Sequence, residues 1–356
     1  MKIGIFDPYL DDLGGGEKYM MRIAECLSEQ NEVYVFWDNS EDIKALKERF
    51  LFDLTRVKLT KNIFSKDFPF LRRLIESRRY DIIIVLSDGS IPFLLSKKTF
   101  IHTQQPLPYQ NINIKTKLKL SRISKFFSNS KYTKSYVDKS LGVESLVLYP
   151  PIELKPKKIK KENIILHVGR FRVRNVPKIE DYKKQAVMVR VFKKMVDGGL
   201  KNWRFILALS IKKENRGAFE KLKEMTKGFP IEFQINKNNN ALWDTYSKAK
   251  IYWHASGFGE DLKNHPELAE HFGISTVEAM GGGAVPVVIN AGGQAEIVED
   301  GENGFLWNTT EELIEKTYDL IKNEKFLEKI SEEAIKRAHY FAGDRFCQEV
   351  SNLVLK

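Results

Sequence analysis

Short apolar runs alternate with longer amphipathic segments through the first 150 residues. From 20 to 27, apolar residues recur at the i, i+3, i+4 and i+7 spacing of a helix that buries one face. The apolar runs are short and uninterrupted, which predicts strands buried on both faces. We place these strands at 2–6, 32–37, 81–86, 99–102 and 146–149. Strands of this kind with helices between them predict a parallel sheet covered by helices on both sides.

The alternation stops at Pro150-Pro151 and restarts after residue 163. The segment 150–163 is rich in lysine and poor in apolar residues, which is typical of an interdomain linker. Beyond it we predict strands at 164–168, 204–209, 231–235, 251–253 and 285–289, and helices at 184–196, 217–227, 275–280 and from Glu296 onward. The C-terminal residues that follow are helical by pattern.

This order of elements predicts an α/β protein with two Rossmann-like, doubly wound parallel-sheet domains. We assign residues 1–153 to the first domain and 154–335 to the second, and we expect 336–356 to form a C-terminal helix that packs back on the first. Ligands of such sheets bind beyond the carboxyl ends of the strands. Two domains facing each other therefore predict a cleft lined by these strand ends.

Composition narrows the class of protein. Of 356 residues, 42% are hydrophobic and 29% are charged, and the net charge of +11 favours anionic partners such as phosphates, lipid headgroups or nucleic acid. Cys26 and Cys347 are far apart in the sequence, which fits a reducing compartment and resembles no metal site. The chain opens directly on a strand, and its apolar runs fall far short of the ~18 residues that span a bilayer. We therefore expect a cytoplasmic protein whose contact with a membrane is peripheral.

The most informative segment for chemistry is 269–280. Ser275 and Glu278 have the S-x-x-E spacing of a capping box, which predicts a helix that starts at Ser275. The amides of Gly273, Ile274 and Ser275 would then lie at a positively polarised helix start, where a diphosphate binds well. Glu270 and Glu278 are placed to accept hydrogen bonds from sugar hydroxyls. The alternatives are that Glu278 only caps the helix and that Glu270 is a solvated surface charge.

This segment resembles a known family. The run E-H-F-G-I-S-T-V-E, in which seven residues separate two glutamates, is similar to the signature of the family 4 retaining glycosyltransferases, which have the GT-B fold. The similarity extends to neighbouring blocks at 252–260, 281–288, 292–298 and 300–306, and with weaker motifs in the first half it covers most of the chain. The resemblance implies that Glu278 binds the donor ribose, that Glu270 binds the transferred sugar, and that 273–275 holds the diphosphate.

Basic residues of the donor site follow from the same resemblance. The family places an Arg just after the first strand of the second domain and a Lys just before the next helix, both on the diphosphate. Arg170 matches the first, Lys183 matches the second by spacing, and Lys184 is the alternative. Fixed positive charge there would stabilise the leaving nucleoside diphosphate. The alternative for this segment is a solvated basic loop.

Two motifs of the first half also resemble the family. The glycine run that includes Gly15 and Gly16 resembles a G-G-x-E loop facing the donor phosphates and the acceptor, and a flexible turn is the alternative. Asp38 after the second strand imitates the ribose-binding acid of a dinucleotide-binding fold, but G-x-G-x-x-G is absent. His102 follows a short strand at a position where the family often has a His near the sugar; a structural role remains the alternative.

The predicted function is transfer of a hexose, with retention, from a nucleotide sugar to a glycan or lipid-linked acceptor. Front-face departure of the diphosphate is the mechanism we favour, and no metal or other cofactor is expected because Arg170, Lys183 and the helix start supply the charge. Family frequency favours GDP-mannose or a UDP-hexose, with base recognition near 231–240. The alternatives are a catalytically silent nucleotide-sugar-binding protein, a phosphorylase or synthase relative, and a dehydrogenase.

Positive charge is concentrated in the first domain. Residues 111–142 contain eight Lys and Arg against one acid, and 44–79 contain eleven against four. Apolar residues are interleaved with them, at 118, 120, 123, 126 and 127 in the first stretch and at 68, 70, 71, 74 and 75 in the second. Basic amphipathic helices of this type lie on anionic membranes. We predict peripheral association with the inner membrane face and no nucleic-acid partner; a solvated helix face is the alternative.

Overall fold

The computed structural model describes residues 1–12, 15–50, 52–107, 112–173 and 181–355. The chain forms two compact units, which are described separately. Unit 1 comprises Met1–Pro151 and Gly343–Lys356, and unit 2 comprises Ile152–Ala342. The sequence places the boundaries after residues 153 and 335. The second boundary differs because the helix that contains residue 335 continues unbroken to His339.

Unit 1 is built on a seven-stranded sheet whose order is β3-β2-β1-β4-β5-β6-β7. Every pairing in it is parallel, as the predicted sequence of strands and crossover helices requires. The strands are β1 (Lys2–Phe6), β2 (Glu32–Phe36), β3 (Val57–Thr60), β4 (Ile82–Ser87), β5 (Lys98–Thr103), β6 (Lys125–Ser128) and β7 (Leu146–Val147). The sequence patterns miss β3 and β6, which are each four residues long.

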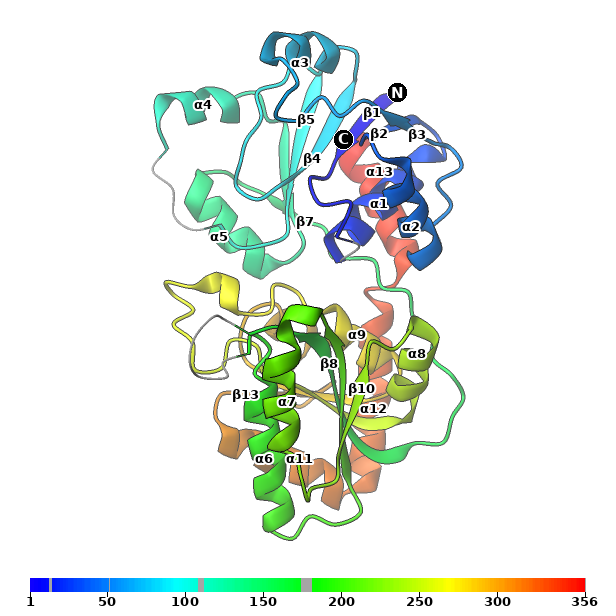
Figure 1. Cartoon of the computed structure of the whole chain (residues 1–356), viewed down its shortest axis with the longest axis vertical. Coiled ribbons are helices and arrows are strands. Elements are labelled where there is room, and N and C mark those ends of the chain that lie inside the picture. The colour runs from blue at the N-terminus through cyan, green and yellow to red at the C-terminus, as the bar shows by residue number, and fades with distance from the viewer. Residues whose placement is uncertain (13–14, 51, 108–111, 174–180, 356) are drawn as a thin grey trace. The chain divides into compact units, whose positions relative to one another are not determined.

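Helices cover both faces of this sheet, as Figure 1 shows. One apolar core lies under α1 (Gly15–Ser28), α2 (Ser40–Phe50) and α13 (Gly343–Leu355). The opposite core receives side chains from the segments around α3 (Phe70–Ser77), α4 (Ile114–Leu120) and α5 (Lys131–Leu141). The expectation that the basic stretch 111–142 forms amphipathic helices is wrong for Phe126 and Phe127, which lie on β6 and are buried in the sheet.

The C-terminal helix α13 completes the core beside α1, and Figure 1 shows it in red next to this helix. Phe346 of α13 is fully buried, and its ring packs edge-on against Tyr19 of α1 at 5.2 Å between centroids. Cys26 of α1 and Cys347 of α13 form a disulfide, with 5.1 Å between their Cα atoms. The sequence reading of two distant cysteines is therefore corrected, since the fold brings together residues 321 positions apart.

Unit 2 contains a six-stranded parallel sheet of order β10-β9-β8-β11-β12-β13. Its elements are β8 (Glu162–Phe171), α6 (Gln185–Asp197), β9 (Arg204–Ile211), α7 (Arg216–Glu224), β10 (Ile231–Ile235), α8 (Asn239–Lys248), β11 (Ala249–His254), α9 (Ile274–Gly281), β12 (Val285–Ile289), α10 (Gln294–Ile297), β13 (Phe305–Trp307), α11 (Thr310–Lys322) and α12 (Glu324–His339), with short 3₁₀ turns at Lys213–Asn215 and Pro266–Leu268. The helix predicted to open at Glu296 is wrong, because α10 is one turn that ends at Ile297.

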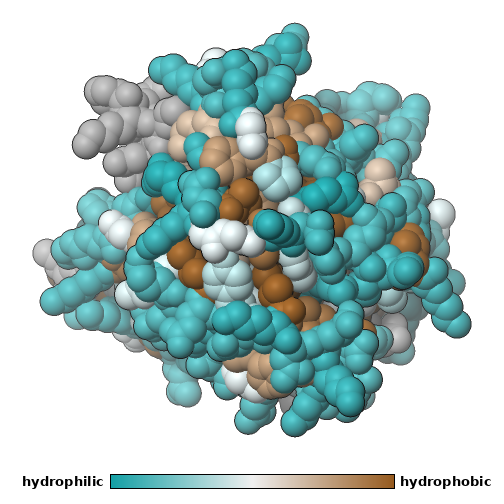
Figure 2. Space-filling model, turned by 90° about the horizontal axis from the view of Figure 1, so that it is seen from below, coloured by the Kyte–Doolittle hydropathy of each residue, from teal (hydrophilic) through white to brown (hydrophobic). Residues whose placement is uncertain are grey.

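A hollow of about 650 Å³ lies at the edge of this sheet where β8 and β9 begin. Its lining combines apolar and basic side chains: Lys160, Lys161, Glu162, Asn163, Leu200, Asn202, Trp203, Arg204, Pro230 and Lys250. The face shown in Figure 2 likewise has hydrophobic side chains lying between hydrophilic ones. Two of its basic side chains already have partners, since Arg204 binds Glu162 and Glu232, and Lys161 donates to two backbone carbonyls. Ligands of parallel sheets bind at the carboxyl ends of the strands, opposite to this hollow, and the predicted site residues of unit 2 lie at those ends.

Candidate active site

The predicted donor-site residues of unit 2 gather where the strand order reverses. β8 and β11 are neighbours in the sheet, and the chain leaves β8 toward β9 but leaves β11 toward β12 on the other side. The two crossover helices diverge from this point, which leaves room for a ligand beyond the strand ends. Arg170 lies near the end of β8 and His254 ends β11.

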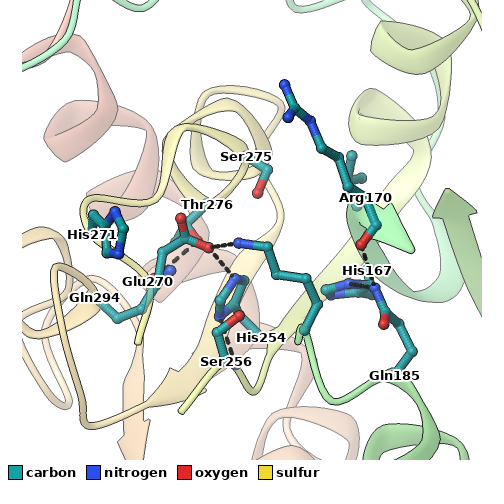
Figure 3. Close-up of polar contacts among 12 residues, drawn as sticks. His167, Arg170, Gln185, His254, Ser256, Glu270, His271, Ser275, Thr276 and Gln294 are labelled. Atoms are coloured by element: carbon teal, nitrogen blue, oxygen red, sulfur yellow. Dashed lines mark hydrogen bonds and ion pairs between the residues drawn. The ribbon is translucent and has the colours of Figure 1, made fainter. Parts of the chain in front are cut away.

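Glu270 is held by two basic side chains from different elements. Its Oε2 atom accepts a hydrogen bond from His254 Nε2 at 2.8 Å and forms an ion pair with Lys183 Nζ. Figure 3 shows the ring of His254 next to the Glu270 carboxylate, on which the hydrogen bonds drawn converge. Only 18% of the Glu270 side chain is exposed. The alternative of a solvated surface charge is therefore wrong.

The protonation states in this group follow from its contacts. Burial pushes the pKa of Glu270 up, but Lys183 and His254 more than offset this and hold it well below its usual range. Burial lowers the pKa of His254, which keeps the ring neutral at physiological pH. The Ser256 amide donates to Nδ1 of this ring at 3.4 Å, so its proton is on Nε2 and points at Glu270. Glu270 is thus an anion whose second oxygen is available for a further hydrogen bond.

The two adjacent lysines have different partners. Lys184 has a left-handed backbone (φ 57°) at the N-cap of α6, and its ammonium pairs with Glu260 at 2.5 Å. Asp181 fixes this turn by accepting hydrogen bonds from the first amides of α6, at 2.6 and 3.1 Å. The side chain of Lys183 is thereby directed to Glu270. The predicted basic loop before this turn lies mostly at 174–180, outside the described residues.

Arg170 is exposed, and its backbone belongs to a buried polar group that sequence reasoning missed. His167 donates from Nδ1 to the Trp253 carbonyl at 3.0 Å, and Gln185 donates to both His167 Nε2 at 3.3 Å and the Arg170 carbonyl at 3.2 Å. In Figure 3 the guanidinium of Arg170 extends away from His167 and Gln185. The signal that could have found His167 and His254 is a polar residue within or at the end of an otherwise apolar strand.

The start of α9 differs from the predicted capping box. The helix begins at Ile274, Gly273 is its N-cap, and no side chain caps it. Ser275 instead hydrogen bonds through its hydroxyl to Tyr252 at 2.8 Å, and Glu278 accepts from the hydroxyl of buried Tyr246 at 2.8 Å. Both predicted caps fail because aromatic hydroxyls from β11 and α8 compete for these side chains. The helix start itself is in place: the Thr276 amide donates to the Gly273 carbonyl at 3.0 Å, and the amides of Ile274 and Ser275 come before the first intrahelical bond.

Gly273 is required at this helix start. Its φ of 126° is a conformation that side chains rarely adopt, and a Cβ there would lie 2.7 Å from Gln294 Nε2. Gln294 is itself fixed, because Thr276 donates to its carbonyl oxygen at 2.9 Å. A neighbouring close approach joins Glu270 to the loop before α10, where the Gly293 amide donates to the Glu270 carbonyl at 2.7 Å. The loop before α10 thus contacts Glu270, and Gln294 of α10 contacts the start of α9, so α10 links the two.

The predicted residues of unit 1 are Gly15, Gly16 and His102. Gly15 and Gly16 begin α1, while Leu13 and Gly14 of the same glycine run lie outside the described residues. A Cβ at Gly16 would lie 2.8 Å from Gln104 Oε1, so the chain passes this side chain closely. The glycines therefore belong to a helix start packed against a neighbouring loop.

His102 is fully buried between two aromatic rings. Tyr19 stacks on one face at 4.2 Å and Phe127 on the other at 4.5 Å. Burial lowers the pKa of His102 to about 3, so the ring is neutral. Its Nδ1 bonds to the Phe127 carbonyl at 3.1 Å, and its Nε2 has no hydrogen-bond partner among the described residues. The stacked, buried ring fits the structural alternative. In the predicted role near the sugar, only Nε2 could contact the substrate.

A buried carboxyl in unit 1 was also missed. Asp7 directly follows β1 and is fully buried, and one of its oxygens accepts from the Tyr9 amide at 2.9 Å. Burial, with smaller contributions from nearby Glu17 and Asp11, raises the pKa of Asp7 to about 7. Its other oxygen has no partner among the described residues. An acid directly after the first strand is the signal that sequence reasoning passed over.

The described residues contain neither a candidate metal cluster nor a candidate membrane span. No group of three or more His, Cys, Asp or Glu side chains in this part of the chain is arranged to hold a metal ion. No helix in it is both long enough and apolar enough to cross a bilayer.

Comparison with known proteins identifies the family. Residues 151–337, which are 187 of the 356, match the family model for glycosyl transferases group 1. Two proteins named GDP-Man:Man(3)GlcNAc(2)-PP-Dol alpha-1,2-mannosyltransferase are each 27% identical: one from Dictyostelium discoideum over 205 residues (53% of this chain, 38% of that protein), and one from Xenopus tropicalis over 179 residues (46% and 34%). The matches thus span little more than a third of those relatives.

Solved structures resemble the fold over nearly the whole chain. Anabaena Alr3699/HepE in complex with UDP and glucose aligns with a TM-score of 0.72 at 18% identity, covering 99% of both chains. A glycosyltransferase from Rickettsia africae ESF-5 aligns with a TM-score of 0.74 at 15% identity, covering 99% of this chain and 97% of that one. With the family match over more than half of its length, the chain belongs to the group 1 glycosyltransferases and is a glycosyltransferase of the GT-B fold.

Proposed function

We propose that this enzyme transfers a hexose, with retention of configuration and without a metal ion, from a nucleoside-diphosphate sugar to a glycan or lipid-linked acceptor. The observation that carries this proposal is the Glu270 carboxylate, held ionised by Lys183 and His254 beside the start of α9. An anion and a polarised helix start side by side suit a nucleotide sugar, which carries both hydroxyl groups and a diphosphate. The carboxylate accepts from sugar hydroxyls, and the helix amides bind phosphate.

Glu278 and its partner suit the nucleoside part of the donor. Tyr246 donates to Oε2 of Glu278, which orients the carboxylate from behind. A carboxylate fixed in this way accepts bidentate hydrogen bonds from the two ribose hydroxyls. Ile274 and Glu278 are four positions apart, so the two lie about one turn, or roughly 6 Å, apart along α9, which is on the scale of the distance between a diphosphate and its ribose.

Positive charge supports departure of the diphosphate. Lys183 carries three donor hydrogens, so it can bind Glu270 and a phosphate oxygen together, and Arg170 is exposed at the adjacent strand end. In the step we propose, the bond from the anomeric carbon to the diphosphate oxygen breaks, and a bond to the acceptor oxygen forms on the same face. The acceptor proton passes to the departing diphosphate. The fixed cations and helix start supply the charge that a metal would otherwise supply.

The names of the relatives direct the choice of donor and acceptor. The Dictyostelium and Xenopus proteins are named for GDP-mannose and for a dolichol-diphosphate-linked glycan. We therefore propose GDP-mannose as the first donor to test and a lipid-diphosphate-linked glycan as the acceptor class. A UDP-hexose is the second donor to test, because a structure of the same fold contains UDP and glucose.

A ligand panel followed by a transfer assay tests the proposal. Thermal unfolding with GDP, UDP, ADP and their sugars should give a rise in Tm for one nucleotide family, since a ligand that binds only the native state stabilises it. Glu270→Gln should then abolish transfer of labelled hexose while the Tm shift with the free nucleotide remains. Glu267→Gln is the matched control, because Glu267 is half-exposed and pairs with His265 away from the cluster.

The outcomes separate the alternatives. A silent nucleotide-sugar-binding protein would show the Tm shift but no transfer or donor hydrolysis by the wild type. A phosphorylase or synthase relative would release or consume sugar phosphate. Stabilisation by a nicotinamide cofactor alone, or full transfer by Glu270→Gln, would overturn the proposal.

A further inference from the structure

Two short helices of unit 1 expose apolar side chains to solvent. Phe70, Leu71 and Ile75 of α3 are 55%, 71% and 61% exposed, and Ile114 and Leu118 of α4 are 86% and 60% exposed. These five are almost half of the eleven large hydrophobic side chains that are exposed in the described part of the chain. Helices that cover a sheet normally turn their apolar side inward. Here the apolar side chains point away from the core.

The exposed residues form a stripe on each helix. Leu71 and Ile75 are four positions apart, as are Ile114 and Leu118, and residues at this spacing lie on the same side of a helix. No residue of α4 is buried. On α3 only Ser77 is buried, and Arg73 anchors the helix by donating to the Ile63 carbonyl at 2.7 Å. The outward stripes are therefore not needed to hold the two helices on the protein.

Basic residues surround both stripes. Exposed cations flank the apolar residues on each helix: Arg72, Arg78 and Arg79 at α3, and Lys115, Lys117 and Arg122 at α4. The acid among them, Glu76, already pairs with Arg79 at 3.0 Å. From 112 to 142 the sequence has one acid, Asp138, and it pairs with Lys134. The surface is thus apolar and positively charged at once.

Both helices belong to the same side of unit 1. Phe68, just before α3, and Leu120 and Ile123, at and after the end of α4, pack against the same apolar core. Figure 1 shows the two helices on the outer margin of this unit. Contiguous exposed apolar patches on soluble proteins mark contact sites with proteins or membranes.

We propose that α3 and α4 together form a docking surface for an anionic lipid bilayer. Aliphatic side chains enter the boundary between headgroups and acyl chains, and the surrounding Lys and Arg bind lipid phosphates. The surface is mainly aliphatic, with Phe70 as its one aromatic residue, whereas proteins that bind single-stranded nucleic acids use aromatic platforms for stacking. The docking surface deepens the proposed function, because it would bring the enzyme to a lipid-linked acceptor.

Vesicle flotation of the full chain tests the surface. The wild type should float with vesicles of phosphatidylcholine that contain phosphatidylglycerol, float poorly with phosphatidylcholine alone, and be released by high salt. The double variants Leu71→Glu/Ile75→Glu and Ile114→Glu/Leu118→Glu should each weaken binding about tenfold or more. Each replaces two apolar side chains that would enter the bilayer with two anions, which anionic lipids repel. Lys115→Ser/Lys117→Ser should weaken binding only to the anionic vesicles.

Matched variants in the same unit control for charge alone. Leu59 on β3 and Leu146 on β7 are 39% and 50% exposed but lie outside both helices, so Leu59→Glu/Leu146→Glu should bind vesicles like the wild type. An unchanged Tm for each variant excludes loss of folding. Failure of the wild type to float would overturn the proposal. So would α3 and α4 variants that bind vesicles as well as the wild type does, or a control variant that loses as much binding as they do. So would loss of RNA or DNA binding in the same variants without any vesicle binding.

The outcome is independent of the donor chemistry. Transfer to a short, water-soluble acceptor should be unchanged in the α3 and α4 variants. Failure of the proposed sugar transfer would leave vesicle binding as it is, and failure of vesicle binding would leave transfer to the soluble acceptor as it is.

Discussion

The Nε2 atom of His254 donates a hydrogen bond to Oε2 of Glu270 at 2.8 Å, and the ring does so in its neutral form. The proton is on Nε2 because the Ser256 amide donates to the other ring nitrogen. His254 is fully buried, whereas Glu270 keeps some exposure. The histidine therefore orients the carboxylate from the buried side, and the exposed part of the carboxylate remains accessible to a substrate.

Loss of this contact should lower the rate of transfer. His254→Ala removes a hydrogen bond to a charged group, which is worth about 1.5–3 kcal/mol, so kcat should fall roughly tenfold to a hundredfold. It should also raise the pKa of Glu270 and move the acid limb of the pH–rate profile upward. His254→Gln, which retains a donor, should restore part of kcat and return the acid limb toward its original position. Equal profiles for the two variants would contradict the positioning role.

The adjacent lysines offer a second comparison. Lys183→Met removes the ion-pair partner of Glu270, and Lys184→Met removes that of Glu260. We expect Lys183→Met to reduce transfer by about two to three orders of magnitude, because removal of one group that stabilises developing charge commonly has this effect. Lys184→Met should mainly lower the Tm. Steady-state kinetics and thermal unfolding of both variants check this, and a reversed order of effects on kcat would assign the catalytic position to Lys184.

Gly273→Ala should damage both stability and donor binding. The added Cβ would lie 2.7 Å from Gln294 Nε2, in a backbone conformation with φ of 126°. Gly301→Ala is a matched control, because Gly301 also has a positive φ, of 80°, but no atom lies within 4 Å of its Cβ position. Backbone strain of about 1–3 kcal/mol is common to both, so the excess loss in Gly273→Ala measures the clash. Similar Tm values and similar nucleotide-induced shifts in the two variants would contradict this.

Much of the fold follows from the sequence because its strands are unusually apolar. β4 is buried along its whole length, and the pattern of 81–86 predicts it within one residue at each end. β6 escapes prediction because Lys125 opens it and only Phe126 and Phe127 mark it as a strand. Such a short apolar pair fits a helix face equally well, and only pairing with β5 decides between them.

The site is predictable to a lesser extent, because partners come from distant segments. Spacing within 269–280 places Glu270 near the start of α9, but it assigns Ser275 and Glu278 to each other as caps. Their true partners, Tyr252 and Tyr246, lie on β11 and α8, and nothing in the local pattern indicates them. The same limit applies to Cys26 and Cys347, which meet only because α13 returns to unit 1.

Asp7 should make the stability of the enzyme depend on pH. The folded state keeps the carboxyl proton up to about pH 7, while the unfolded chain releases it near 3.8. The unfolded state therefore binds fewer protons between these values, and the free energy of unfolding falls as pH rises through this window, by up to about 4 kcal/mol. Asp7→Asn has no proton to lose, so its Tm relative to that of the wild type should rise from pH 4 to pH 7 and then level off. A constant difference across this range would contradict the protonated state.

The disulfide should contribute strongly to the stability of unit 1. Removal of a native disulfide typically costs about 2–5 kcal/mol, and this one closes a very long loop. Cys26→Ser/Cys347→Ser should have a lower Tm, and reductant should lower the Tm of the wild type but not that of the double variant. Thiol titration of the unfolded, unreduced wild type should find no free thiol. Two free thiols in protein taken from cells would instead support the reducing compartment expected from the sequence.

The pairing of α1 with α13 also sets an order in which the two units can mature. Residues 152–342 are contiguous, so unit 2 has all of its strands and helices as soon as they leave the ribosome. Unit 1 has its sheet early but must wait for Phe346 and Val350, which cover the apolar side of α1. During synthesis that side of α1 is open to water, and the first unit to be translated is the last to be completed.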